Sequence, residues 1–367
     1  MSAVGGQVRH LYVHLPFCAH RCGYCDFVTL VGRHGEHGAY VGAVMRELRL
    51  EGGILAPRLE TIFLGGGTPT FTEAGALERL LASLPDADEV TVEANPETVT
   101  PSLARLLSRN RVNRVSLGAQ SFNTSLLAVL ERRCGPEDVR RAVHDLRDAG
   151  FDNISLDLLY GIPGQSTAEL EADVESALAL APEHVSYYEL EAKPGTRFTH
   201  AHGEELARQA DAMEGYFERV VEALVGAGYR WYETANFCLP GREARHNLGY
   251  WLGRDYLGVG IGAVSTLGLE RRRNAPKLAG YVAALARGLA PPREIETLDE
   301  ETKRGERLML GLRLDRPLPL AAVGSAVEPA ALSRVERLGL AERRGDGLVL
   351  SDRGRFLGDA VTAELMA

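Results

Sequence analysis

Three of the five cysteines in this chain lie close together, in the segment Cys18-Ala-His-Arg-Cys22-Gly-Tyr-Cys25. Cysteine thiolates are soft ligands that bind zinc or iron–sulfur clusters. A structural zinc site needs a fourth ligand, and the nearby His20, His34 and His37 offer only short spacings for it. A four-iron cluster normally takes four thiolates, so three thiolates leave one iron open to a non-protein ligand. The C-x3-C-x2-C spacing therefore predicts a [4Fe–4S] cluster on Cys18, Cys22 and Cys25, with zinc as the alternative.

The composition limits the class of protein in which this chemistry takes place. Hydrophobic residues make up 45% and charged residues 25% of the 367 residues, which is typical of about two globular domains. The net charge of −9 disfavours broad binding to nucleic acid phosphates. An odd set of five cysteines does not fit a secreted disulfide framework, so we expect a reducing, cytoplasmic location. The sequence shows neither an apolar stretch of the about 20 residues that span a membrane nor the features of a signal peptide.

The cysteines follow the first of six short apolar segments, most of which lead into an amphipathic helical pattern. The predicted strands are His10–Leu15, Thr61–Leu64, Val90–Glu93, Arg114–Leu117, Ile154–Leu158 and His184–Leu190. The predicted helices include Tyr40–Leu55, Pro101–Ser108, Pro136–Ala149, Ala168–Leu180 and Glu204–Gly226, and a further strand is expected at Tyr229–Thr234. This repeated order predicts an α/β fold with a parallel sheet, closed as a TIM-like partial (β/α)6 barrel.

Polar residues stand at the end of each predicted strand. The run Gly65-Gly66-Gly67-Thr68 follows the second strand, Glu93 and Asn95 the third, Gln120 the fourth and Asp157 the fifth. The carboxyl ends of parallel barrel strands form one rim, where the active sites of such barrels lie. The sequence therefore predicts a site for a large polar ligand at this rim.

The pattern changes after residue 235, so we divide the chain into a barrel (1–235), a connecting segment (236–292) and a C-terminal module (293–367). In the module, helical patterns at Leu298–Leu312 and Pro329–Leu338 precede a hairpin at Leu340–Leu350. This order predicts an α+β region that ends in a winged-helix-like module. Its 12 basic and 14 acidic residues favour a docking role over DNA binding.

The cysteine segment, with Tyr24 before Cys25, resembles the signature of the radical S-adenosylmethionine (SAM) superfamily. Further matches are Gly65-Gly66-Gly67-Thr68-Pro69-Thr70, Glu93-Ala-Asn95-Pro96, Gly118-Ala-Gln120-Ser-Phe122 and Asp157-Leu-Leu-Tyr160-Gly-Ile-Pro163-Gly. Together they resemble the branch that contains oxygen-independent coproporphyrinogen III dehydrogenase and its relatives, the haem chaperones of the HemW family. The resemblance covers nearly the whole chain. It implies a radical SAM barrel whose cluster is held by three cysteines and whose open iron is chelated by SAM.

The resemblance also implies roles for single residues. Tyr12 and Gly67 would contact the cluster-bound SAM, and Glu93 would accept hydrogen bonds from its ribose hydroxyls. The dehydrogenase binds a second SAM, for which the matching positions here are Tyr24, Thr68, Gln120, Arg132 and Asp157. Whether one or two SAM molecules bind stays open, as does whether SAM is cleaved. Cys134 and Cys238 receive no role.

The two main functions that fit this resemblance are haem transfer to acceptor haem proteins without catalytic turnover, and oxidative decarboxylation of coproporphyrinogen III. A third option with the same scaffold is a SAM-dependent enzyme that modifies or opens a porphyrin. Three features favour the haem chaperone. First, the dehydrogenase extends its signature to C-x-C, whereas here Cys25 is followed by Asp26-Phe27, so phenylalanine stands in the last position. Second, only 17 residues precede Cys18, whereas the dehydrogenase carries a long N-terminal extension. The segment His246-Asn247-Leu248-Gly249-Tyr250-Trp251 matches the HNxxYW motif that marks the chaperones and is linked to haem.

The chaperone interpretation assigns haem to His246, Tyr250 and Trp251, because a histidine can ligate iron and flat aromatic rings can cover a macrocycle. Arg242 and Arg245 are near enough in sequence to meet propionates. The alternative for the same motif is a helix start in which Tyr250 and Trp251 are core residues. The expected partners are haem and acceptor haem proteins, with the respiratory chain favoured and membranes met only through these acceptors. A homodimer is one alternative for the oligomeric state.

Overall fold

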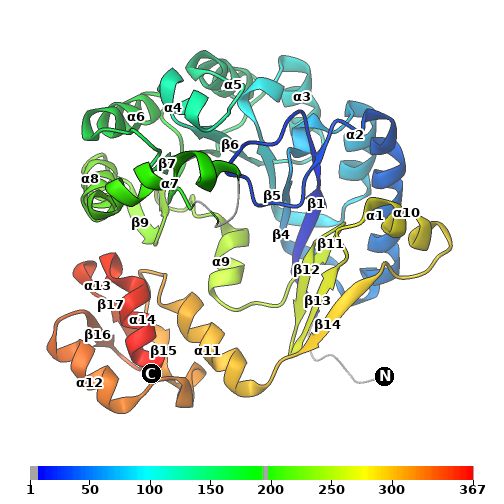
Figure 1. The fold of residues 1–367 in the computed structure, drawn as a ribbon. Helices are drawn as coiled ribbons and strands as arrows, with labels where there is room; N and C mark the ends of the chain where they lie inside the picture. The colour runs from blue at the N-terminus through cyan, green and yellow to red at the C-terminus, as the bar shows by residue number, and fades with distance from the viewer. Residues whose placement is uncertain (1–6, 192, 194–196, 367) are drawn as a thin grey trace.

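A computed structural model describes residues 7–191, 193 and 197–366. Six parallel strands form the centre of the sheet in the order β1-β4-β5-β6-β7-β8, as Figure 1 shows. They are β1 (His10–Leu15), β4 (Arg58–Gly66), β5 (Asp86–Ala94), β6 (Arg114–Gln120), β7 (Ile154–Tyr160) and β8 (His184–Glu189). The six strands predicted from the sequence are therefore confirmed, and with them the partial barrel.

Helices cover the outside of this sheet (Figure 1). They are α1 (His37–Glu51), α2 (Ala74–Ser83), α3 (Pro101–Arg109), α4 (Thr124–Val129), α5 (Pro136–Asp148), α6 (Thr167–Ala179), α7 (Arg197–Gln209) and α8 (Met213–Gly226). Side chains alternate along each strand, so residues such as Leu11 and Val13 pack outward in the main hydrophobic core. Residues of the other parity, such as His10, Tyr12, Thr61 and Glu93, face the polar interior of the barrel, where the site is built.

One helix prediction was wrong. The sequence pattern predicted a single helix at Glu204–Gly226, but the structure breaks it at the 3-10 turn Ala210–Ala212 into α7 and α8. Gln209 beside this break lies over the loop after β7, and its Oε1 accepts from Gly164 N at 3.2 Å. The break thus lets α7 turn across the carboxyl rim while α8 packs on the sheet.

The barrel sheet is extended at both edges: the strand predicted at Tyr229–Thr234 is confirmed, whereas the two strands that the segment from residue 236 onward contributes were not predicted. β9 (Arg230–Glu233) and β10 (Asn236–Cys238) extend the sheet beyond β8 in antiparallel orientation. β11 (Leu257–Val259) pairs in parallel with β1 at the other edge. β10 and β11 have three residues each, which is too short for a recognisable period.

A second sheet follows β11 and consists of β12 (Val264–Leu267), β13 (Glu270–Asn274) and β14 (Arg293–Thr297). Between β13 and β14, α10 (Leu278–Ala286) packs against α1. β13 and β14 belong to one sheet although the predicted boundary 292/293 separates them. The division into three domains stays a prediction.

The C-terminal module has the predicted winged-helix-like order. α11 (Glu300–Gly311) and α12 (Pro329–Arg337) precede the hairpin of β16 (Ala341–Arg344) and β17 (Gly347–Leu350), and β15 (Leu318–Pro319) adds a third strand. α14 (Gly358–Met366) completes a separate small core, whereas α13 (Asp352–Phe356) places Phe356 against Phe217 and Trp231 of the main core.

The module docks on the β9 edge of the barrel. Arg313 Nε donates to the fully buried Glu233 carboxylate at 2.6 Å, and the Arg355 guanidinium lies 3.5 Å from the ring centre of Trp231. None of the helices in the described residues is both long and apolar enough to cross a membrane.

Candidate cluster loop and ligand sites

The three clustered cysteines lie on one loop at the carboxyl end of β1. β2 (Phe17–Cys18) and β3 (Leu30–Val31) pair in parallel and close this loop at its base. Gly32 N donates to Cys18 O at 3.0 Å, and Cys25 N donates to Cys22 O at 3.2 Å. Burial raises the pKa of the Cys18 and Cys25 thiols, so metal binding at this loop has to displace protons.

A chain of polar contacts connects the cysteine loop to the neighbouring strand ends. Cys18 Sγ lies 3.4 Å from Thr68 Oγ1, which also accepts from Asn95 Nδ2 at 3.1 Å. Arg132 then donates to Asn95 Oδ1 at 3.1 Å and, through Nη1, to Cys22 Sγ at 3.7 Å. A cation beside thiols favours their thiolate form. Because Arg132 Nε is buried and has no partner among the described residues, a bound anionic group would satisfy it, so these residues fit a thiolate-held cluster and its anionic ligand.

The histidines considered for a zinc site are engaged elsewhere. His20 Nε2 donates to Glu131 O at 2.5 Å. His37 Nδ1 accepts from Glu73 N at 3.1 Å while its Nε2 contacts Gly32 O at 3.3 Å, and His34 packs against Phe71. Within the described ranges, no three His, Cys, Asp or Glu side chains are arranged to hold one metal ion.

Glu93, the expected ribose partner, lies inside the barrel below the glycine-rich turn. Its Oε2 accepts from Gly66 N at 3.1 Å. Gly66 has φ +110°, and a Cβ there would lie 2.4 Å from the His14 ring, so glycine is required for the turn to approach β1. Burial, followed by the charge of Asp157, raises the pKa of Glu93 to about 7. Burial, followed by the charge of Glu93, likewise raises the pKa of Tyr12.

The glycine at the predicted SAM position, Gly67, packs tightly against the protein itself. A Cβ at Gly67 would lie 2.6 Å from the backbone of Pro16. The glycine run therefore forms a tight turn, and its close packing holds the cysteine loop against β4.

The residues expected around a second ligand surround the same interior. Arg132 Nη2 donates to Gly118 O at 2.7 Å, and its charge interacts with buried Tyr24. Gln120 ends β6 with φ +67°, a strained conformation for a residue with a side chain. Asp157 accepts from Ser116 Oγ at 2.9 Å, and burial raises its pKa. The structure thus gathers all of these predicted positions at the carboxyl half of the barrel.

Two further residues organise this site: sequence reasoning named Asn95 only as a strand-end residue without a role of its own, and it missed Arg114. Asn95 joins Thr68 to Arg132, and its place two residues after Glu93 at a strand end was the available signal. Arg114 is 2% exposed at the start of β6 and its charge lowers the pKa of both Glu93 and Asp157. A buried arginine cannot be told from a surface one in sequence, because both occur at strand starts.

The HNxxYW motif forms α9 (Arg245–Trp251), which closes the amino end of the barrel (Figure 1). His246 is 1% exposed, its Nδ1 lies 2.7 Å from Thr61 Oγ1 and its Nε2 lies 2.9 Å from Tyr250 Oη. The ring stacks on Phe63 at 5.2 Å between centroids. Burial lowers the pKa of His246 to about 3, so it is neutral. Both ring nitrogens are engaged, and iron could reach His246 only after one of these bonds breaks.

The other residues assigned to haem separate in the structure. Tyr250 lines a cavity, whereas the Trp251 ring faces Arg313, whose guanidinium carbon is 4.6 Å from its centroid. Arg242 pairs with Asp152 at 3.1 Å and Arg245 with Asp88 at 3.6 Å, both on the surface. Cys238 is fully buried in β10, as expected for packing.

Comparison with known proteins adds the relationship that the geometry alone does not give. The Radical SAM superfamily profile matches residues 12–177, and the HemN C-terminal domain profile matches residues 298–357. "Heme chaperone HemW" of Mycobacterium tuberculosis is 37% identical, with 100% of this chain and 97% of that protein covered.

The chain belongs to the HemW family.

A second HemW family relative, "Heme chaperone HemW" of Bacillus subtilis, is 32% identical and covers 96% of this chain and 98% of its own length. Among solved structures, coproporphyrinogen III oxidase (HemN) from Escherichia coli superimposes with a TM-score of 0.84 over 100% of this chain and 92% of that one, at 20% identity. This likeness shows that the HemW family chain has the radical SAM fold of that protein.

Proposed function

We propose that this protein binds haem and transfers it to acceptor haem proteins. The observation that carries the proposal is the 37% identity over the whole chain to a protein named for haem chaperoning. The residues of the cysteine loop support it further. Phe27 stands two residues after Cys25 and is 66% exposed, so the loop offers no fourth thiol at this position.

The proposal includes a [4Fe–4S] cluster on Cys18, Cys22 and Cys25 and a SAM molecule beside it. When bound, such a cluster supplies one open iron for the amino and carboxylate groups of SAM. Glu93 would then accept hydrogen bonds from the ribose hydroxyls of SAM, and Tyr12 and Gly67 would contact the same molecule. Arg132 places a positive charge next to the Cys22 thiolate. Tyr24, Thr68, Gln120 and Asp157 remain the proposed positions for a second SAM.

For haem we assign Tyr250 as the contact residue of α9 and His246 as its positioning residue. This assignment follows from the hydrogen bond of 2.9 Å between His246 Nε2 and Tyr250 Oη. Because His246 is buried and its other nitrogen is bound to Thr61, it fixes where the Tyr250 hydroxyl points. Trp251 contributes by holding α9 against Arg313 of the C-terminal module.

The test uses anaerobically reconstituted full-length protein in two assays. Haem titration should give a saturable Soret shift, and haem-loaded protein should transfer haem to an apo-haem protein. Coproporphyrinogen III with SAM and a reductant should give no protoporphyrinogen. Stoichiometric vinyl-group formation would instead establish the dehydrogenase activity and contradict the proposal.

The cluster assignment is tested by iron and acid-labile sulfide content. Cys22→Ser should lose both, while Cys134→Ser is the matched control and should keep them. Cys134 is suited to this because it is buried near the same arginine, with Arg132 Nη2 at 3.6 Å, but lies outside the cysteine loop.

A further inference from the structure

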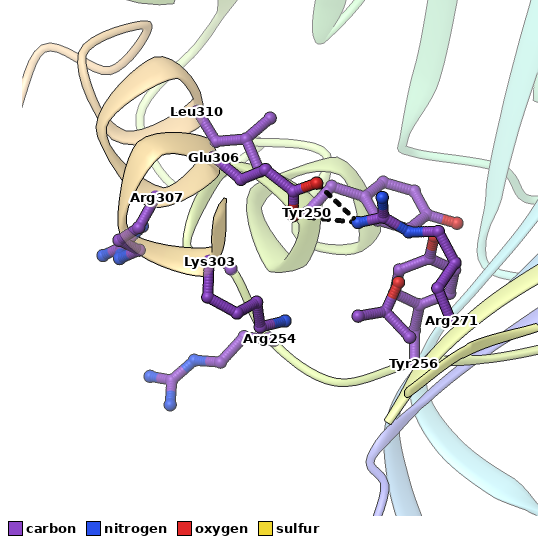
Figure 2. Close-up of a pocket in the computed structure, with 10 residues that line it drawn as sticks. Tyr250, Arg254, Tyr256, Arg271, Lys303, Glu306, Arg307 and Leu310 are labelled. Atoms are coloured by element: carbon purple, nitrogen blue, oxygen red, sulfur yellow. Dashed lines mark hydrogen bonds and ion pairs between the residues drawn. The ribbon is translucent and has the colours of Figure 1, made fainter. Parts of the chain in front are cut away.

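A cavity of about 200 Å³ lies beside α9, between the second sheet and α11 (Figure 2). Its walls come from three parts of the chain that are far apart in sequence. Tyr250 and Arg254 come from α9 and the turn after it, Arg271 comes from β13, and Lys303 and Arg307 come from α11. The last two residues are four apart on one helix and therefore share a face.

The cavity is strongly cationic. Arg254, Arg271, Lys303 and Arg307 line it together with a single carboxylate, Glu306. That carboxylate is already used, because Arg271 Nη2 donates to both of its oxygens at 2.8 and 2.9 Å (Figure 2). Three positive charges in the lining are therefore left without a carboxylate in the cavity wall.

Arg254 and Arg307 are close enough to repel one another. The side chains of Arg254 and Lys303 form no ion pair or hydrogen bond with any residue in the described part of the chain. Arg307 Nη1 donates to Trp251 O at 2.8 Å, a neutral partner. Burial and the charge of Arg254 lower the pKa of Arg307. Such a cluster is stabilised by an anion that accepts charge-assisted hydrogen bonds.

One wall of the cavity is aromatic. Tyr250 and Tyr256 meet edge to face with 4.6 Å between their centroids, and Leu310 adds an apolar side chain. Tyr250 Oη also lies 2.9 Å from His246 Nε2 on α9, which closes the amino end of the barrel. A ligand in this cavity therefore contacts the HNxxYW motif directly. An aromatic wall beside cations suits a ligand that is flat and apolar at one part and anionic at another.

The size of the cavity limits which part of a ligand it encloses. Pockets that enclose a whole drug-sized ligand have volumes of about 300–1,000 Å³. A cavity of about 200 Å³ takes only one edge of a tetrapyrrole. Arg254 is exposed, which leaves the cavity accessible from solvent on that side.

We propose that this cationic cavity binds the propionate edge of haem, with Arg254, Lys303 and Arg307 holding the carboxylates and Tyr250 and Tyr256 contacting the adjoining ring. The inference rests on the proposed haem-carrier function and gives it a location. It replaces Arg242 and Arg245 as the propionate partners, since both are paired on the surface with Asp152 and Asp88.

The experiment compares haem with haem dimethyl ester, whose propionates carry no charge, on full-length protein in one buffer. Soret titrations are run on the wild type and on the double variant Arg254→Gln/Lys303→Gln. The matched control is Arg287→Gln/Arg304→Gln, which removes the same charge from exposed positions outside the cavity, one of them on α11. Circular dichroism verifies that all variants fold.

The double variant should bind haem about 10- to 100-fold more weakly than the wild type, as expected when charged hydrogen bonds are lost, and the control within about twofold. Haem dimethyl ester should bind wild type and double variant alike. Equal haem affinity of wild type and double variant would overturn the cavity assignment while leaving the haem-carrier proposal standing. A wild type that gives no Soret shift at all would overturn the haem-carrier proposal, and the cavity assignment with it.

Discussion

Replacing His246 with alanine separates a structural role for this residue from direct ligation of iron. The ring is 1% exposed, stacks on Phe63 and forms hydrogen bonds of 2.7 Å with Thr61 and 2.9 Å with Tyr250. Truncating a buried aromatic side chain to alanine costs about 3–5 kcal/mol. We therefore expect His246→Ala to lower the free energy of unfolding of the haem-free protein by about 4 kcal/mol at pH 7.5.

The pH dependence of this loss provides a second measurement. Burial lowers the pKa of His246 from its usual 6.5 to about 3, so the folded state excludes a proton that the unfolded state binds below pH 6.5. The stability that this group contributes is complete above pH 6.5 and is lost as the pH falls towards 3. At 1.36 kcal/mol per pH unit, the wild type loses about 2 kcal/mol from this group by pH 5. The alanine variant lacks that loss, so its deficit should shrink to about 2 kcal/mol.

Urea denaturation at pH 7.5 and pH 5, followed by circular dichroism on haem-free protein, measures both quantities. Tyr250→Phe is the control, because it removes the hydroxyl partner of His246 but leaves the ring buried and still able to titrate. A His246→Ala protein as stable as the wild type, or a deficit that does not change between the two pH values, would refute a buried, neutral and structural His246.

Three further changes test other contacts. Glu93→Gln should weaken SAM binding about 10-fold in equilibrium dialysis. The affinity of the wild type for SAM should rise from pH 6 to pH 8, as the Glu93 carboxyl with its pKa of about 7 ionises. A SAM affinity that does not change with pH would contradict this. Arg132→Lys should lower the iron content of the protein, because an ammonium cannot replace a guanidinium that reaches Asn95, Gly118 and Cys22. The control Arg133→Lys, at an exposed position, should leave the iron content unchanged. Equal iron content in both variants would exclude a role of Arg132 in holding the cluster. Arg313→Ala should cost about 3–5 kcal/mol in thermal unfolding because it leaves buried Glu233 unpaired, and a loss below about 1 kcal/mol would show that this contact does not hold the module.

The barrel could be predicted because its strands are short apolar segments, most of which are followed by an amphipathic helical pattern. β1 was predicted with its observed ends, since the mainly apolar segment His10–Leu15 is followed directly by Pro16. The cluster loop was also predictable, because its three thiols are adjacent in sequence. Glu93 and Asp157 could be named as site residues because parallel strands bring their carboxyl ends to one rim.

The remaining features depend on contacts that no local pattern encodes. β11 joins β1 through three residue pairs between segments about 246 positions apart, and loop-closure of that length leaves no local signal. The cationic cavity likewise joins residues from α9, β13 and α11. His246 could be recognised as part of a motif, but whether its ring faces solvent, iron or Thr61 is decided only by how α9 enters the barrel.

α9 closes the amino end of the barrel and separates the proposed SAM residues at the carboxyl rim from the cationic cavity. His10, Thr61 and His246 are all at most 6% exposed, so these side chains are closely packed where α9 closes the barrel. The proposed haem and SAM sites are therefore separate, so either ligand would bind without blocking the other. The rings of Tyr12, Phe63, His246 and Tyr250 form a continuous row that connects the two sites, with neighbouring centroids 6.2, 5.2 and 4.9 Å apart.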